Sequence, residues 1–271
     1  MRTFVLLLLS LIPAAFASSY EKNGRGARPI AMANAFVAVP DDPWTPWYNP
    51  ASLATVSSFK SSLCFVPKQY GLRELRTMSA AAVLPTSLVN VGLVIDDFGS
   101  PLYRESTVLF GFGRAIESGV AIGVAANVEM IMIERYGTAS VVTIDLGARV
   151  ELLECLSLGY AWKNIGAATI GASHDALSQI QIVGLCYSSN DLAQMTLDLE
   201  KDIRFPFVLR GGIELHLLDE LVFRFGCSTN PDIFAVGFGA RLAGWECAYA
   251  LNTHAQLGLT HSIGISFEIP R

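Results

Sequence analysis

The sequence is poor in charge and has no long apolar run beyond its first 17 residues. Charged residues make up 16% of the 271 residues, whereas hydrophobic residues make up 52% and the mean hydropathy is +0.42. Soluble proteins carry about 25% charged residues, and a membrane-spanning helix needs a run of about 18 apolar ones. Because only helices and closed barrels satisfy every backbone polar group in lipid, this composition favours a transmembrane β-barrel.

Other absences narrow the function. The net charge of −5 argues against nucleic acid as a partner. The five cysteines are scattered without C-x-x-C spacing, which argues against a disulfide framework or a zinc site. No Walker, Rossmann or zinc-site pattern is present. His174 and His261 lie beside serines, but adjacent strand residues point to opposite faces, so neither pair makes a triad. We therefore expect a protein that is not an enzyme and uses no metal and no cofactor.

The first 17 residues are expected to form a cleaved secretory signal peptide. Arg2 precedes an apolar stretch over 4–12, and Ala15-Phe16-Ala17 is a small-x-small cleavage pattern. The stretch is too short for a membrane anchor. We therefore expect export through the periplasm to the outer membrane of a Gram-negative-type bacterium, where lipid would surround the barrel.

From Ser57 onward, apolar stretches of about ten residues recur, and Gly, Pro, Asn and Asp separate them, as in transmembrane β-barrels. The alternation is clear in 140–151, where Val142 and Ile144 are flanked by Thr143 and Asp145. Such alternation predicts one apolar and one polar face, and a soluble sandwich with its apolar face inward is the alternative. We predict an all-β, antiparallel transmembrane barrel over 57–271, of about fourteen strands, near 57–68, 76–84, 88–97, 106–113, 120–133, 140–151, 156–164, 178–188, 193–201, 207–217, 221–228, 233–242, 245–252 and 260–269.

The connections between these segments differ in length. Those after even-numbered strands are short, and several after odd-numbered strands are longer, namely 98–105, 165–177 and 253–259. Outer-membrane barrels have short periplasmic turns and longer outer loops. The pattern therefore predicts that both termini are periplasmic.

Residues 18–56 are rich in proline and contain Trp44, Trp47 and Tyr48, so they do not read as a strand series. We expect a periplasmic or plug segment. Its sequence resembles the N-terminal signature of the PorV/PorQ family, within the wider FadL-like barrels, with Ala33-Asn34 where the family usually has Gly-Gly. The residues that carry this resemblance are Gly26, Ala27, Arg28, Met32, Ala35, Phe36, Asp41, Asp42, Asn49, Pro50, Ala51 and Leu53.

Segments 145–149, 162–166 and 257–263 also look similar to the family, so the resemblance spans nearly the whole chain after the signal peptide. It implies a fourteen-strand barrel whose N-terminal segment folds into or under the lumen. It further implies a role in protein secretion of the type IX kind or in outer-membrane assembly, with a translocon or exported cargo proteins as partners. The alternative is a FadL-like conduit that takes up a hydrophobic small molecule.

Charged residues at the polar positions of the strands are expected to face the lumen. Ionisable groups there pair with one another or meet water, so they form either structural ion pairs or a gated passage. Within 18–56, the Asp41-Asp42 pair either initiates a turn or neutralises a luminal arginine, and the aromatic residues either pack or line a lipophilic pocket. The candidate luminal charges are Glu129, Asp145, Arg149, Lys163, Asp198, Glu200, Arg210, Glu214, Arg224 and Arg241.

Overall fold

The computed structural model describes residues 24–172, 174–189 and 192–269. The expected signal peptide, residues 1–17, lies outside the described residues. None of the helices in the described ranges is long and apolar enough to cross a membrane.

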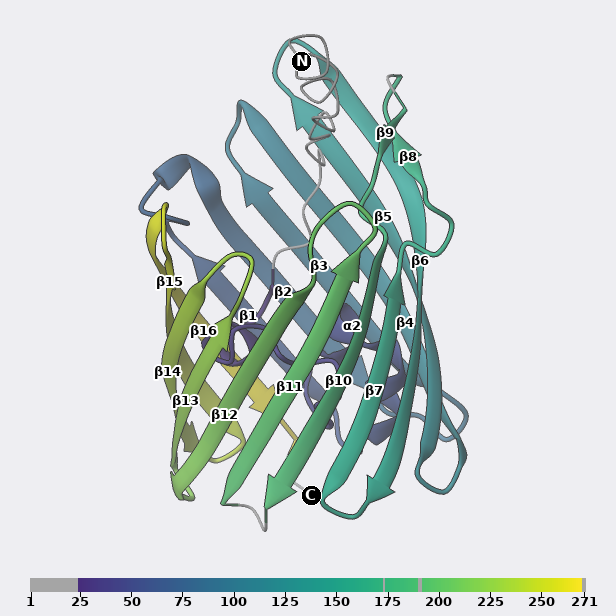
Figure 1. Ribbon diagram of the computed structural model, residues 1–271, viewed down its shortest axis with the longest axis vertical. Helices are drawn as coiled ribbons and strands as arrows, with labels where there is room; N and C mark the ends of the chain where they lie inside the picture. Colours follow the sequence, from purple (N-terminus) through teal and green to yellow (C-terminus); the bar gives the residue numbers. More distant parts are fainter. Residues whose placement is uncertain (1–23, 173, 190–191, 270–271) are drawn as a thin grey trace, which may run out of the picture.

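The chain forms a closed antiparallel barrel of fourteen strands (Figure 1). Each strand pairs with its neighbours in sequence, and the first strand pairs with the last, Lys60 opposite Glu268, to close the barrel. A two-stranded hairpin, β8 (Thr169–Ile170) and β9 (Asp175–Ala176), lies in the connection between β7 and β10. The barrel strands are β1 (Lys60–Val66), β2 (Arg76–Leu84), β3 (Asn90–Gly99), β4 (Tyr103–Glu117), β5 (Val120–Ile133), β6 (Gly137–Leu153), β7 (Leu156–Lys163), β10 (Ile180–Ser189), β11 (Ala193–Asp202), β12 (Val208–Leu218), β13 (Leu221–Ser228), β14 (Ile233–Leu242), β15 (Trp245–His254) and β16 (Gly258–Glu268).

This architecture confirms the predicted fold class and strand number. Two of the predicted long loops are wrong, because pairing continues through most of 98–105 and 253–259 and leaves only 100–102 and 255–257 unpaired. Polar side-chain contacts join the strands in these stretches, and a hydropathy pattern does not reveal such contacts. One such contact joins Arg104 Nε to Asp97 Oδ1 at 2.5 Å across β3 and β4.

The apolar rows of the strands lie on the outside of the barrel. In β6, Val142, Ile144 and Leu146 are 60%, 38% and 38% exposed, whereas Thr143 and Asp145 are each 2% exposed. An apolar outer band around a closed barrel is the surface that faces lipid in membrane barrels. The arrangement excludes the sandwich alternative, which needs the apolar rows at the centre.

Residues 24–56 lie inside the barrel, where Figure 1 shows them in purple, and are called the luminal segment below. They contain two short helices, α1 (Ala27–Ala31) and α2 (Thr45–Tyr48), and a 3-10 helix, η1 (Pro50–Thr55). A further 3-10 turn, η2 (Arg73–Leu75), lies between β1 and β2. Helix α1 contacts β13 to β16 and η1 contacts β3 to β6, so the segment bridges opposite walls.

Glycines on the inner wall let the backbone of the luminal segment approach closely. A Cβ atom added to Gly123 would lie 2.3 Å from the carbonyl carbon of Pro50, and one added to Gly226 would lie 2.3 Å from that of Met32. On β7, a Cβ atom at Gly159 would lie 2.5 Å from the Val37 oxygen. Such distances are far below van der Waals contact, so the wall accommodates the segment only where side chains are missing.

A left-handed turn follows α1. Ala33 and Asn34 have φ angles of 50° and 63°, and the Asn34 amide donates to the Pro29 oxygen at 2.8 Å. Glycine adopts this conformation at no steric cost, and asparagine tolerates it better than other residues do. The backbone at these positions is therefore one that Gly-Gly would also adopt.

Replacing Gly123 with alanine should destabilise the barrel, because the new methyl group overlaps the backbone at Pro50. Overpacking of this kind costs about 1–3 kcal/mol. We expect a lower midpoint of denaturant unfolding for Gly123→Ala. The control is Gly211→Ala on β12, where the nearest atom to the added Cβ is 3.8 Å away. Equal midpoints for the two variants would contradict the close packing.

Candidate functional site

The luminal segment divides two cavities. The lower chamber, about 740 Å³, lies at the rim that holds the C-terminal end of β16. The upper chamber, about 840 Å³, lies among the connections at the opposite rim. Residues of the luminal segment line both, including Trp47 and Tyr48 above and Asp41 and Asp42 below. A molecule inside one chamber therefore meets the segment before it reaches the other.

Apolar and aromatic side chains make up much of the upper chamber. Val37, Trp47 and Tyr48 of the luminal segment form its floor. Tyr48 packs against Phe36 with ring centroids 5.1 Å apart, and burial raises the pKa of its hydroxyl above the ordinary value. The apolar and aromatic wall residues are Tyr70, Leu75, Phe98, Tyr103, Ile180, Ile182, Phe205, Val208, Ile233 and Leu257.

The upper chamber also contains ionisable groups. Asp198 holds the luminal segment, because its Oδ2 accepts hydrogen bonds from the backbone amides of Phe36 at 2.7 Å and Val37 at 3.0 Å. Arg210 forms an ion pair with Glu200 on the neighbouring strand. Lys163 donates to the Trp47 backbone oxygen. Four of the predicted luminal charges thus bind the luminal segment or one another.

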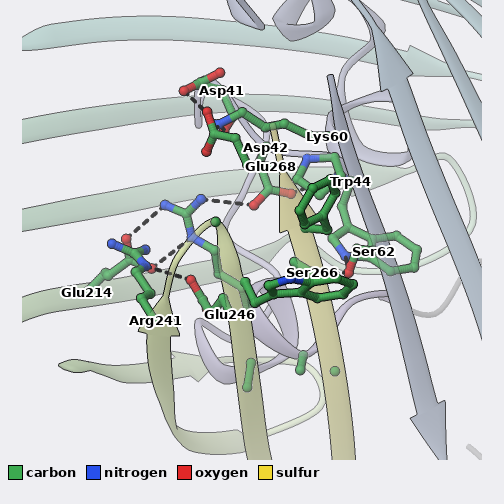
Figure 2. A pocket seen from close by; sticks show the side chains of 18 of the residues that line it. Asp41, Asp42, Trp44, Lys60, Ser62, Glu214, Arg241, Glu246, Ser266 and Glu268 are labelled. Atoms are coloured by element: carbon green, nitrogen blue, oxygen red, sulfur yellow. Dashed lines mark hydrogen bonds and ion pairs between the residues drawn. The ribbon is translucent and has the colours of Figure 1, made fainter. Parts of the chain in front are cut away.

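Six charges of alternating sign, called the charge ladder, border the lower chamber. Figure 2 labels four of them, Asp42, Glu214, Arg241 and Glu246. The centre of the ladder is Glu214, only 1% exposed, which accepts from Arg28 at 2.8 Å and from Arg224 at 2.6 Å. The ladder continues from Arg28 to Asp42 at 2.9 Å and from Arg224 to Glu246 at 2.7 Å. In sequence of contact its members are Asp42, Arg28, Glu214, Arg224, Glu246 and Arg241.

The ladder ties the luminal segment to four strands, β12 to β15. Three acidic and three basic groups balance their charges, which is required where ions are buried. His216 adds a contact to Glu214, with Nε2 2.9 Å from Oε1. In this arrangement the ion pairs join the luminal segment to the strands and the strands to one another.

A second group of contacts crosses the seam where β1 meets β16. Lys60 Nζ lies 3.0 Å from Glu268 Oε2 and 2.9 Å from Asp41 Oδ2. Ser266 donates to Ser62 at 2.9 Å, and Trp44 Nε1 donates to the same Ser62 hydroxyl at 3.1 Å. The residues that close the barrel therefore also hold the luminal segment.

The residues of the luminal segment that carry the sequence resemblance have identifiable structural roles. Asn49 donates to the oxygens of Val37 and Ala148 at 2.8 and 3.0 Å, and its Oδ1 accepts from Ala51 at the start of η1. Asp42 takes part both in a turn and in an ion pair. Its Oδ1 accepts a hydrogen bond from the Trp44 backbone amide, and its Oδ2 pairs with Arg28. Burial raises the pKa of Asp42, and Arg28 opposes that shift. The other residues that carry the resemblance, Gly26, Ala27, Met32, Ala35, Phe36, Pro50 and Leu53, are buried.

The remaining predicted luminal charges also lie on the inner wall. Asp145 accepts from the Asn164 amide at 2.8 Å and so anchors the connection between β7 and β10. Glu129 accepts from Thr143 at 2.8 Å. Arg149 pairs with Glu151 at 2.9 Å. These three belong to neither the charge ladder nor a single cluster.

The connection after β7 covers the inner face of the tall wall formed by β4 to β6. Ile170 and Leu177 of this connection pack with Ile131 of β5. Asn164 stabilises its base, because its Oδ1 accepts from the Ala168 amide at 3.0 Å. This connection therefore narrows the upper end of the lumen.

Sequence reasoning missed one buried pair of charges. Arg25 binds Asp96 of β3 through two hydrogen bonds of 2.5 and 2.7 Å, and its guanidinium lies over the Trp47 ring. Asp96 interrupts an apolar strand at an inward position, in phase with buried Val94. That phase is the signal that identifies Asp96 as luminal.

Among the described residues, no group of three or more His, Cys, Asp and Glu side chains could hold a metal ion. The contacts reported above are hydrogen bonds and ion pairs that hold side chains in place. The chemistry they support is noncovalent binding.

Replacing Glu214 with glutamine should destabilise the luminal segment, because Arg28 and Arg224 would lose their shared counter-charge. Breaking a buried ion pair from one side costs about 3–5 kcal/mol. We expect Glu214→Gln to lower the unfolding midpoint and to speed chymotryptic cleavage after Phe36 in the folded barrel, because the Arg28 guanidinium lies 5.6 Å from the Phe36 ring. Glu220→Gln, on the exposed turn between β12 and β13, is the control. Unchanged cleavage in Glu214→Gln would contradict a role for the ladder in holding the segment.

Comparison with known proteins gives a likeness of fold. No family model matches the sequence, and no curated protein matches it. Among solved structures, the Ralstonia pickettii toluene transporter TbuX has a TM-score of 0.67 at 13% identity, covering 91% of this chain and 99% of that one. The CymD monoaromatic hydrocarbon channel has a TM-score of 0.66 at 10% identity, covering 93% and 100%. A Pseudomonas aeruginosa FadL homologue has a TM-score of 0.63 at 10% identity, covering 90% and 98%. The chain therefore has the barrel fold of FadL-like proteins.

Proposed function

We propose that this protein is an outer-membrane barrel that takes up small hydrophobic molecules and that the upper chamber is their binding site. The main support for this proposal is the chamber itself, a cavity of about 840 Å³ that is lined on its lower side by Val37, Trp47 and Tyr48 of the luminal segment. Small-molecule sites have volumes of about 300–1,000 Å³ and mostly apolar walls with a few polar groups. The upper chamber falls within that range of volumes, and its lining combines apolar and aromatic side chains with polar and charged ones.

The apolar outer band supports placement in a membrane. The turns at the lower rim are short, for example 118–119, 219–220 and 243–244, whereas the connection after β7 at the opposite rim covers 164–179. In outer-membrane barrels the short turns are periplasmic. The upper chamber would then open toward the outside of the cell and the lower chamber toward the periplasm.

The two chambers and the segment between them also set a requirement for transport. A molecule bound above crosses the barrel only if the luminal segment shifts or if the molecule leaves through the wall. The segment is held by noncovalent contacts, and the glycine contacts, the charge ladder and Asp198 all oppose its displacement.

The fold likeness is consistent with this function, since two of the neighbours are a toluene transporter and a monoaromatic hydrocarbon channel. A role in protein secretion or outer-membrane assembly, which the PorV/PorQ resemblance implies, stays a prediction, and no observation above favours it over uptake. The absence of an enzymatic activity likewise stays a prediction.

Filling the upper chamber tests the proposal. Ile182 of β10 is 7% exposed and lines the chamber, whereas Leu185 of the same strand is 38% exposed on the outer face. We expect the unmodified barrel to speed toluene uptake by Gram-negative cells that lack a hydrocarbon channel. Ile182→Trp should remove most of that increase, and Leu185→Trp should retain it.

Heat-modifiable mobility on a gel shows whether each variant has folded in the outer membrane. A folded wild-type barrel that leaves toluene uptake unchanged would contradict the proposed function. Equal uptake by the two tryptophan variants would contradict the assignment of the upper chamber.

A further inference from the structure

We propose that the ligand of the upper chamber is a hydrophobic molecule with a hydrogen-bond donor at one end, an amine or a hydroxyl group, and that Asp198 accepts that hydrogen bond. The inference rests on the proposed function and narrows its substrate class. It follows from the charges of the chamber, from the hydrogen bonds of Asp198 and from the apolar residues around that carboxylate.

The charges of the chamber disfavour an anionic ligand. Four carboxylates line it, those of Glu105, Asp198, Glu200 and Asp202, against two cations. One of the four, Asp202, pairs with Arg204 just outside the lining, with Nε 3.5 Å from Oδ1. Both cations already donate to protein acceptors, Lys163 to the Trp47 oxygen and Arg210 to Glu200. A carboxylate ligand would therefore enter a chamber with an excess of negative charge and with cations engaged elsewhere.

The two carboxylate oxygens of Asp198 differ in their hydrogen bonds. Its Oδ2 accepts from Phe36 and Val37, but its Oδ1 is buried and has no hydrogen-bond partner among the residues that the structure describes. Gly184 on the neighbouring strand makes room for it, because a Cβ atom there would lie 2.1 Å from Oδ1. A buried acceptor without a partner is costly, so a donor supplied by a ligand would stabilise it.

Apolar side chains stand beside this carboxylate. Asp198 is 2% exposed and lines the chamber together with Val37, Ile180 and Ile182, which form one hydrophobic cluster. A ligand that donates to Oδ1 would place its hydrocarbon part against that cluster. The site thus fits a molecule that is apolar over most of its surface and polar at one end.

Three probes that share one ring distinguish this proposal from its alternatives. They are 4-ethylbenzylamine, whose ammonium is only a donor, ethylbenzene, which has no polar group, and 4-ethylbenzoate, whose carboxylate is only an acceptor. Binding is measured by ligand-observed NMR on the unmodified barrel in zwitterionic nanodiscs, with empty nanodiscs as background. We expect the amine to bind about tenfold more tightly than ethylbenzene, as one hydrogen bond to a charged group provides, and the benzoate to bind most weakly.

Asp198→Asn is the matched variant. An asparagine keeps one oxygen for the Phe36 and Val37 amides and presents an NH2 group where Oδ1 stands. We expect the advantage of the amine over ethylbenzene to be lost and the benzoate to gain affinity. Asp219→Asn, on the exposed turn at the lower rim, should leave the ranking unchanged.

The outcomes separate the two proposals. Equal binding of the three probes to the unmodified barrel, or tightest binding of the benzoate, would overturn the donor inference while ethylbenzene binding left the proposed function standing. Failure of all three probes to bind would overturn the proposed function itself. The ranking on the unmodified barrel decides the question even if Asp198→Asn does not fold.

Discussion

The close contact between the luminal segment and the barrel wall is the constraint on which the rest of the structure depends. The segment fits because the wall presents glycines such as Gly123 and Gly226 where its backbone passes. A fourteen-strand barrel has a wider interior than an eight-strand barrel, whose side chains alone fill it. The luminal segment fills the middle of that interior and leaves a chamber on each side of it.

Because the luminal segment excludes water from the middle of the lumen, the charged side chains buried there are stabilised by pairing with one another. The ladder around Glu214 and the seam at Lys60 join strands to the segment, so they hold it in place and fix the strand register. Asp198 holds the opposite side through two backbone amides. The two chambers differ, since the charge ladder borders the lower one, whereas the lining of the upper one combines aromatic and aliphatic side chains with charged groups such as Asp198 and Glu200.

The sequence predicts which face of the barrel wall each strand residue lies on, but it does not predict which inward side chains contact one another. Alternation in strands such as β6 fixes which residues point inward, because successive strand residues face opposite sides. It cannot say which inward residues meet across the lumen, and the pairing of Arg25 with Asp96 joins residues 71 positions apart. Loop boundaries also escaped prediction, because β3 and β4 continue on polar pairs such as Arg104 and Asp97 after the apolar pattern ends.

The four tryptophans provide the most direct test of the central claim, that the apolar rows face lipid while residues 24–56 fill the lumen. Trp162 and Trp245 lie on outward positions, whereas Trp44 and Trp47 are 2% and 4% exposed inside the barrel. The measurement is tryptophan fluorescence in bilayers with brominated acyl chains, on one variant with only the outer pair and one with only the inner pair. The account predicts strong quenching of the outer pair and little of the inner pair, and equal quenching of both would contradict it.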